Sequence, residues 1–145
     1  MIGFDFELVN KESNYLFRLL RQFDFDRFIW HIPFHEVYPI DDDVDVFPER
    51  IISGDKFKEI INNTYYLVFA SIGAFPIESS FNNVTNYKEY RDSTCYFYLI
   101  CVDSCFGKIF CKDTEMLNKI KKECNGEDIL FINDIVHEDD QAKFY

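Results

Sequence analysis

The sequence predicts one domain of the α+β class, with a mixed or mainly antiparallel sheet of about five to seven strands and about three helices. A length of 145 residues is typical of a single domain, here 1–145. Residues 95–102 are apolar without interruption, which is typical of a strand buried on both faces. Strand-like and helix-like patterns alternate along the chain, so hairpins mix with helical crossovers.

The most apolar part of the chain is a predicted hairpin. Its two runs, Cys95–Val102 and Ile109–Cys111, are separated by Asp103–Lys108. Asp103, Ser104 and Gly107 favour a turn, so we expect a link of about five residues between two paired strands. A hairpin this apolar must be covered by other elements on both sides.

The first half of the chain alternates between strand and helix patterns. Apolar and polar residues alternate over Ile2–Val9, which predicts a half-buried strand with Phe4, Phe6 and Leu8 on one face and Gly3, Asp5 and Glu7 on the other. The next elements are a helix carrying Leu16, Leu19, Leu20 and Phe23 and capped by Asn10 or Ser13, a strand Phe28–Pro33 ended by Pro33, a second short strand His35–Pro39, and an exposed loop Ile40–Arg50.

The second half predicts the remaining elements from similar signals. They are a helix from Ser53-Gly54-Asp55 to Asn62, a central strand Thr64–Phe75, a loop Pro76–Thr85, a short helix Asn86–Asp92 capped by Asn86, a helix capped by Asp113 and ending at Cys124, and a last strand Asp128–Asn133. The tail 136–145 is polar, so we expect it to fray.

Composition and charge restrict the classes of partner. The formal net charge is −11, and non-specific binding to phosphates depends on Lys and Arg, so nucleic acid and membranes are poor candidates. The first residues, MIGFDFE, contain no basic or apolar stretch typical of a signal peptide. The five cysteines are then expected to be free thiols in a cytoplasmic protein.

No linear motif assigns catalytic residues, a metal or a cofactor. Cys95, Cys101, Cys105 and Cys111 lie at gaps of six, four and six residues, which does not fit zinc spacing. The pair His31 and His35, followed by Glu36, hints at a transition-metal site, but Pro33 lies between the two histidines. Glycine-rich phosphate loops and the GxSxG motif of hydrolases are absent from the sequence.

A cluster of acids resembles part of a calcium loop. Asp41, Asp43 and Asp45 stand at positions 1, 3 and 5 of the EF-hand pattern. Val46 replaces the glycine of position 6, and Ile52 replaces the glutamate of position 12. The EF-hand interpretation therefore fails, and weak calcium binding by these carboxylates is the alternative that remains.

The negative charge is concentrated in two segments. Residues 28–49 contain six acids and no Lys or Arg, and residues 125–141 do the same. One interpretation is two solvated, solubilising loops. The other is one acidic surface, formed by both segments together, that binds a basic partner. The candidate residues of that surface are Glu36, Asp41, Asp42, Asp43, Asp45, Glu49, Asp134, Glu138, Asp139 and Asp140.

The chain resembles an uncharacterised family of short cytoplasmic proteins from Bacillus, Clostridium and their relatives. The resembling stretches span nearly the whole chain and include Gly3–Glu7 with Asn10, Trp30, Glu36–Tyr38, Ser53-Gly54, Tyr65-Tyr66, Ala74–Pro76, Val102–Ser104 and Cys111–Asp113. None of these stretches is a catalytic signature. The resemblance implies a bacterial cytoplasmic protein and no assigned activity.

These observations support three hypotheses. The leading one is a non-enzymatic acidic module of the immunity or inhibitor type, which binds a basic protein and gains mainly in association rate from its charge. The second is a small-ligand binder or an enzyme whose site is assembled from distant residues, with Asp103, Cys105, His31 and His35 as candidates. The third is a structural homo-oligomer that uses surplus aromatic surface.

Overall fold

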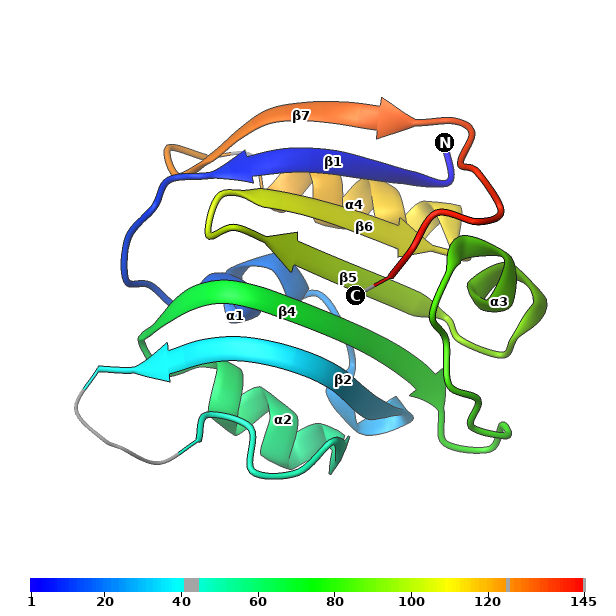
Figure 1. Ribbon diagram of the computed structural model, residues 1–145, viewed down its shortest axis with the longest axis horizontal. Coiled ribbons are helices and arrows are strands. Elements are labelled where there is room, and N and C mark those ends of the chain that lie inside the picture. The colour runs from blue at the N-terminus through cyan, green and yellow to red at the C-terminus, as the bar shows by residue number, and fades with distance from the viewer. Residues whose placement is uncertain (41–44, 125, 145) are drawn as a thin grey trace.

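One antiparallel sheet forms the centre of the molecule. The computed structural model describes residues 1–40, 45–124 and 126–144. In these ranges, seven strands have the order β3-β2-β4-β5-β6-β1-β7 (Figure 1). The strands are β1 (Gly3–Leu8), β2 (Phe28–Pro39), β3 (Ile51–Ser53), β4 (Tyr65–Pro76), β5 (Phe97–Val102), β6 (Phe106–Cys111) and β7 (Ile129–Ile135).

Four helices accompany the sheet, and together they confirm the predicted α+β class and single domain. They are α1 (Tyr15–Leu20), α2 (Gly54–Ile61), α3 (Tyr87–Asp92) and α4 (Thr114–Cys124), and a 3₁₀ turn, η1, spans Phe25–Arg27. All neighbouring strands pair antiparallel, so the sheet is antiparallel rather than mixed.

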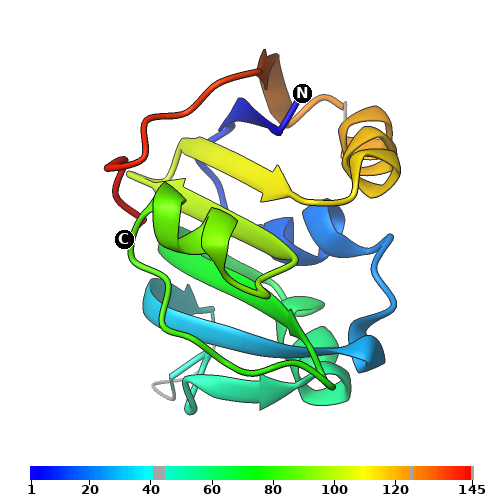
Figure 2. The ribbon, with the colours of Figure 1, turned by 90° about the vertical axis from the view of Figure 1, so that its right-hand side faces the viewer.

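Helices α1, α2 and α4 cover one side of the sheet, which we call the helical face (Figures 1 and 2). The larger apolar core lies there, and the Trp30 ring stacks on Phe57 of α2 with 4.4 Å between ring centroids. Helix α2 begins so close to η1 that a Cβ atom on Gly54 would lie 1.9 Å from the carbonyl oxygen of Phe25. Glycine is therefore required at the first residue of α2. The sequence predicts a helix start at this position.

The opposite side, which we call the open face, is covered only in part, by α3 and by the C-terminal tail (Figure 2). The described part of the tail, up to Phe144, packs on this face. Phe144 is 6% exposed and its ring lies 4.6 Å from that of Tyr98 and 5.4 Å from that of Phe110. The backbone N–H of Phe144 donates to the carbonyl of Thr85. One buried aromatic ring therefore fixes a segment that is otherwise polar.

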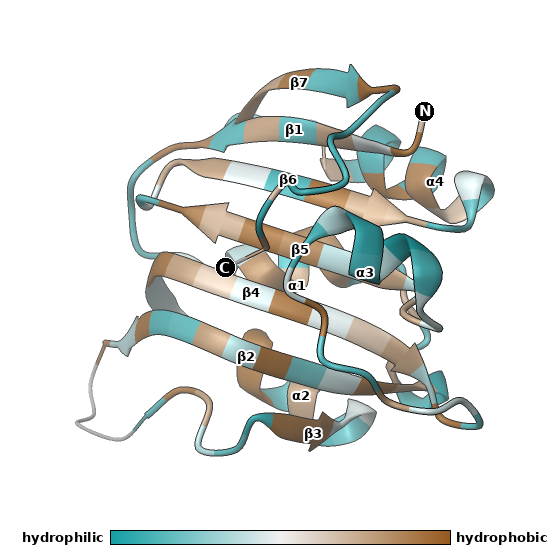
Figure 3. Cartoon of the chain, turned by 45° about the vertical axis from the view of Figure 1, so that its right-hand side comes forward, coloured by the Kyte–Doolittle hydropathy of each residue, from teal (hydrophilic) through white to brown (hydrophobic). Residues whose placement is uncertain are grey.

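Strand β5 is central, as predicted, and both of its faces are covered. Phe97, Leu99 and Cys101 point into the helical face, and Tyr98 and Ile100 point into the open face, all with at most 5% exposure. Figure 3 shows the apolar colouring that follows β4 and β5, in contrast to the polar surface of α3.

The link between β5 and β6 is shorter than expected. It consists of residues 103–105 alone, because Phe106 and Gly107 already belong to β6. Asp103 and Ser104 have φ angles of 54° and 63°, a left-handed conformation that Asp tolerates better than most residues. Two consecutive residues in this conformation turn the chain tightly. Phe106 and Gly107 can therefore pair with β5, and the hairpin is longer than the sequence composition predicts.

Strand β2 differs most from the prediction, because Pro33 does not end it. The strand continues to Pro39, and β3, which the sequence analysis did not predict, pairs with it only from Ile29 to His31. Pro33 therefore lies beyond β3, at a register shift against β4, where its missing N–H leaves no ladder bond unmade. The predicted strands Phe28–Pro33 and His35–Pro39 are one bulged strand.

Most helix starts follow their predicted caps. Asn86 accepts a hydrogen bond from the N–H of Glu89, and Asp113 accepts from the N–H groups of Glu115 and Met116. The N-cap of helix α1 is Asn14 rather than Asn10 or Ser13, and neither Asn14 nor Ser53, the N-cap of α2, makes a side-chain capping bond. Burial of the apolar side of α1 therefore stabilises this helix instead of a cap.

Candidate functional site

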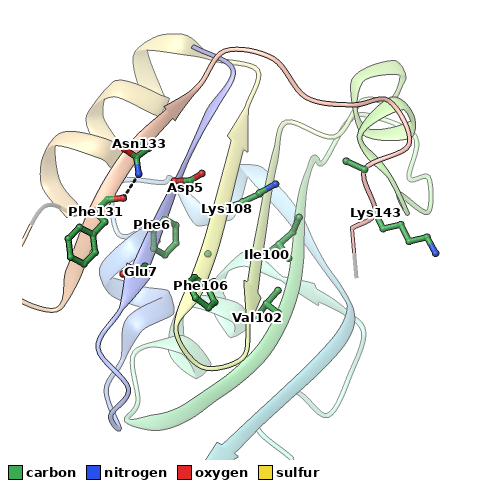
Figure 4. Close-up of a pocket in the computed structure, with 12 residues that line it drawn as sticks. Asp5, Phe6, Glu7, Ile100, Val102, Phe106, Lys108, Phe131, Asn133 and Lys143 are labelled. Atoms are coloured by element: carbon green, nitrogen blue, oxygen red, sulfur yellow. Dashed lines mark hydrogen bonds between the residues drawn. The ribbon is translucent and has the colours of Figure 1, made fainter.

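The open face carries a groove between the sheet and the C-terminal tail (Figure 4). Its volume is about 540 Å³, and strands β1, β5, β6 and β7 supply most of its lining. Ile100 and Val102 of β5 give it an apolar side, and Asp5 and Glu7 of β1 bring two carboxylates (Figure 4). An apolar cavity with a few convergent polar groups is the usual form of a binding site.

The alternating sequence of β1 positions both carboxylates. Phe4, Phe6 and Leu8 are buried in the helical face, so Asp5 and Glu7 point to the open face. Gly107 of β6 allows the Phe6 ring to pack closely, because a Cβ atom there would lie 2.3 Å from that ring. The packing of Phe6 therefore fixes the strand from which both carboxylates project.

Two exposed phenyl rings flank Glu7. Phe106 of β6 lies opposite Glu7 in the register and is 51% exposed. Phe131 of β7, on the other side of β1, is 70% exposed. Its φ angle of 54° coincides with a register shift between β1 and β7. This bulge places the ring at the rim of the groove (Figure 4).

Four charged residues line the groove, namely Asp5, Glu7, Lys108 and Lys143, and the ammonium group of Lys143 points away from the two carboxylates (Figure 4). Lys108 lies opposite Asp5 in the register, but its ammonium is 3.1 Å from the carboxylate of Glu138. Within the described ranges, neither Asp5 nor Glu7 forms an ion pair. Two uncompensated carboxylates beside aromatic rings suit a cation that has apolar neighbours, since carboxylates and ring faces both attract positive charge.

The described acids of the two segments do not form the predicted single acidic face. The described acids of the first segment, Glu36, Asp45 and Glu49, lie in β2 or between β2 and β3, whereas the acids of the second segment lie before, in and after β7. Strands β2 and β7 are second and last in the sheet order, so about 24 Å of sheet separates them. The prediction was wrong because it assumed that the last strand lies beside β2, whereas β7 pairs with β1.

Carboxylates of the second segment are largely compensated inside the molecule. Asp134 pairs with Lys121 at 2.5 Å, Asp140 with Arg91 at 2.5 Å and Glu138 with Lys108. Asp139 accepts a hydrogen bond from the backbone N–H of Gln141. These contacts link β7 and the tail to α4, α3 and β6, mostly at exposed positions.

The first segment contributes fewer contacts. The Tyr38 hydroxyl donates to the carboxylate of Glu36 at 2.6 Å, and Asp45 and Glu49 are exposed. Asp41, Asp42 and Asp43, with the calcium-loop interpretation that rests on them, lie outside the described residues.

The four candidates for a site assembled from distant residues do not meet. Asp103 and Cys105 lie in the β5–β6 turn, whereas both histidines belong to β2, beyond β4. His31 contacts Phe81 on the open face and His35 contacts Phe47 on the helical face. After the bulge at Pro33, the alternation of side chains between the two faces is shifted by one residue. The two histidines therefore project to opposite faces of the sheet and cannot bind one metal ion.

Burial is the largest influence on the pKa of these histidines. It lowers the pKa of His31 and His35, and the nearby guanidinium of Arg50 acts in the same direction on both. Asp45 opposes this effect at His35. Within the described ranges, no group of three or more His, Cys, Asp or Glu side chains is arranged to hold a metal ion.

The five cysteines are all free thiols, and four of them are buried. Burial raises the pKa of Cys95 and Cys101 to about 12, and that of Cys111 and Cys124 to about 11. Because the thiolate is the reactive form, these four are poor nucleophiles. Cys105, in the β5–β6 turn, is partly exposed.

Alkylation by iodoacetamide at pH 8 is expected to modify Cys105 first in the folded protein. The other four thiols react only when the protein unfolds, because burial both shields them and keeps them protonated. Mass spectrometry is expected to show one rapidly formed adduct on the folded protein, and five adducts on the unreduced protein after unfolding in urea. Three or fewer adducts after unfolding would show a disulfide and contradict the expected free thiols.

The sequence analysis missed the groove, although it placed Asp5 and Glu7 on one face of the first strand. The sequence analysis did not show which strands lie beside this first strand in the sheet. Insertion of β1 between β6 and β7 brings Phe106 and Phe131 to either side of Glu7. Pairing between segments about a hundred residues apart leaves no local signal in the sequence.

The fold and the groove define a single-domain α+β protein with one partly covered sheet face. No helix in the described part of the chain is long and apolar enough to cross a membrane. A family model described as protein of unknown function (DUF2691) matches residues 1–145, so the chain belongs to this family. This agrees with the resemblance to an uncharacterised family seen in the sequence.

A curated relative extends the comparison. The uncharacterised protein YncE of Bacillus subtilis (strain 168) is 28% identical over 140 residues, which cover 91% of this chain and 92% of the relative. The similarity therefore extends over nearly the full length of both chains. No solved structure matches this chain.

Proposed function

We propose that this protein is a non-enzymatic binding module of the bacterial cytoplasm, of the immunity or inhibitor type, and that its groove receives basic side chains of a partner protein. The observation that carries the proposal is the pair of uncompensated carboxylates, Asp5 and Glu7, beside the exposed rings of Phe106 and Phe131. The five free thiols support a reducing compartment.

The electrostatics of the whole chain favour such a partner. A net charge of −11 attracts a basic protein over long range and raises the rate of association. Exposed acids such as Asp45 and Glu49, which lie between β2 and β3 and do not line the groove, contribute to this steering. Short-range specificity then comes from the groove, where a lysine or arginine replaces water between carboxylates and ring faces.

A small organic cation is the second candidate ligand, because the volume of about 540 Å³ lies within the range of small-molecule sites. Lysine- and phenylalanine-containing peptides and benzyltrimethylammonium represent the two classes of ligand. The same variants of Asp5 and Glu7 test both.

We expect a fluorescein-labelled peptide of alternating lysine and phenylalanine to bind, with an affinity that falls as salt rises. The double variant Asp5→Asn/Glu7→Gln is expected to lower this affinity about tenfold or more, equivalent to about 1.4 kcal/mol. Fluorescence anisotropy measures both effects. Benzyltrimethylammonium is added as a competitor, and its inhibition constant shows whether the groove alone suffices for binding.

The matched control is Glu12→Gln/Glu59→Gln, which removes the same amount of charge at exposed positions of the chain. It should leave the affinity within about twofold, because distant surface charges contribute little beyond a Debye length. An equal loss in both double variants would mean that only net charge matters, and the groove would not be the binding site.

A further inference from the structure

The two edges of the sheet differ in how well they are protected. At one edge, β3 has three residues and leads directly into α2. At the other, β7 has seven residues and pairs only with β1, so the backbone groups along its outer side have no strand partner within the described ranges. An edge strand of this kind is a template for another strand.

The usual devices that protect an edge are few on β7. Its sequence, ILFINDI, contains no proline and no basic residue. Asp134 is bound to Lys121 of α4 and so points to the helical face. The bulge at Phe131 interrupts the edge at one position, and the backbone beyond it, residues 132–135, is regular.

Apolar side chains bracket the same edge. Val136 is 76% exposed and Phe131 is 70% exposed, the two highest values among the large apolar residues of the described ranges. Phe131 also forms the rim of the groove (Figure 4), so the edge and the groove are one continuous surface. Exposed apolar residues beside an unpaired edge are typical of an interaction site.

We propose that the β7 edge binds an extended segment of the basic partner protein by strand addition, with lysine or arginine side chains of that segment reaching Asp5 and Glu7. The inference rests on the proposed function and adds the geometry of the bound partner. An added strand beside β7 lies about 10 Å from β1, two strand spacings away. Long basic side chains on its open-face side can span this distance above Asn133.

Charge argues against a second copy of this chain as the occupant. Each copy carries a net charge of −11 and would bring its own acidic groove to the shared edge. Pairing of β7 with β7 would therefore place like charges close together, whereas a basic segment compensates Asp5 and Glu7. The complementary partner is a cationic, apolar, extended peptide.

Amide hydrogen exchange of the full chain, measured by NMR with and without the lysine–phenylalanine peptide, tests strand addition. We expect the peptide to slow exchange by about tenfold or more at those amides of residues 132–135 that face away from β1, since newly formed backbone bonds protect edge amides. A peptide of the same sequence, with alternate backbone nitrogens methylated, should bind about tenfold more weakly because it has lost donors and kept its charge.

A pair of variants separates the edge from general charge effects. Val136→Lys places a cation at the β7 edge and is expected to weaken peptide binding about tenfold. Ile77→Lys adds the same charge at another exposed apolar residue, 55% exposed, and should change binding about twofold or less. Circular dichroism confirms that both variants fold. Equal effects of the two would overturn the edge as the docking site.

The outcomes distinguish this inference from the function on which it rests. Peptide binding that depends on Asp5 and Glu7 without protection of residues 132–135 would overturn strand addition and keep the groove. No dependence on Asp5 and Glu7 would overturn both. Protection of the same amides without peptide, together with a dimer in sedimentation, would identify a second copy as the occupant and overturn the basic partner.

Discussion

Replacing Phe144 by alanine is expected to lower the free energy of unfolding by about 3–5 kcal/mol. Its ring stacks on Phe110 at an interplanar angle of 15° and also contacts Tyr90 and Tyr98. Removal of the ring exposes this cluster on the open face. Urea denaturation followed by tryptophan fluorescence measures the loss.

The matched control for this variant is Lys143→Ala, which changes the neighbouring exposed side chain and keeps the backbone bridge between Asn86 and Lys143. Surface substitutions of this type usually change stability by no more than about 0.5 kcal/mol. If Phe144→Ala were equally mild, the tail would not pack on the sheet, and the tail side of the groove would be open.

Local patterns in the sequence were sufficient to predict elements that depend on near neighbours. The side chains of Asn86 and Asp113 cap helices by bonding to residues at most three positions away. The apolar run of β5 places apolar side chains on both faces of the sheet, whichever strands lie beside it. Such features follow from the rules of helix ends and buried strands. They are therefore visible without knowledge of the fold.

Features that depend on distant pairing were not predictable in the same way. Pro33 is tolerated in β2 because β3 does not extend as far as Pro33. The sequence around Pro33 does not indicate where β3 ends. The described acids of the two segments lie towards opposite ends of the strand order because β7 pairs with β1, the first strand, rather than with β2. Charge counts along a sequence cannot reveal which strands become neighbours.

The groove combines both kinds of feature. The alternation that turns Asp5 and Glu7 to one face is local and was recognised, whereas their surroundings come from β6 and β7. The position of Phe131 further depends on a left-handed backbone at a residue other than glycine, which sequence patterns do not predict. The candidate site could therefore be predicted in part, by its carboxylates and not by its rings.

Replacing Leu99 by alanine is expected to lower the free energy of unfolding by about 2–5 kcal/mol, because the variant leaves a cavity in the helical-face core. Leu99 is fully buried and lies between Ile72 of β4 and Ile109 of β6, in the centre of the sheet. Backbone strands on both sides limit how far the core can collapse into the space.

Leu99→Met is the control, since a swap that conserves volume usually costs less than about 1.5 kcal/mol. Urea denaturation compares the two variants with the parent protein, and amide exchange reports on β5 directly. Amides of Phe97–Val102 are expected to exchange only through global unfolding, because both neighbouring strands bond to β5. Exchange there as fast as in a loop would contradict the central position of this strand, and with it the scaffold that holds the groove.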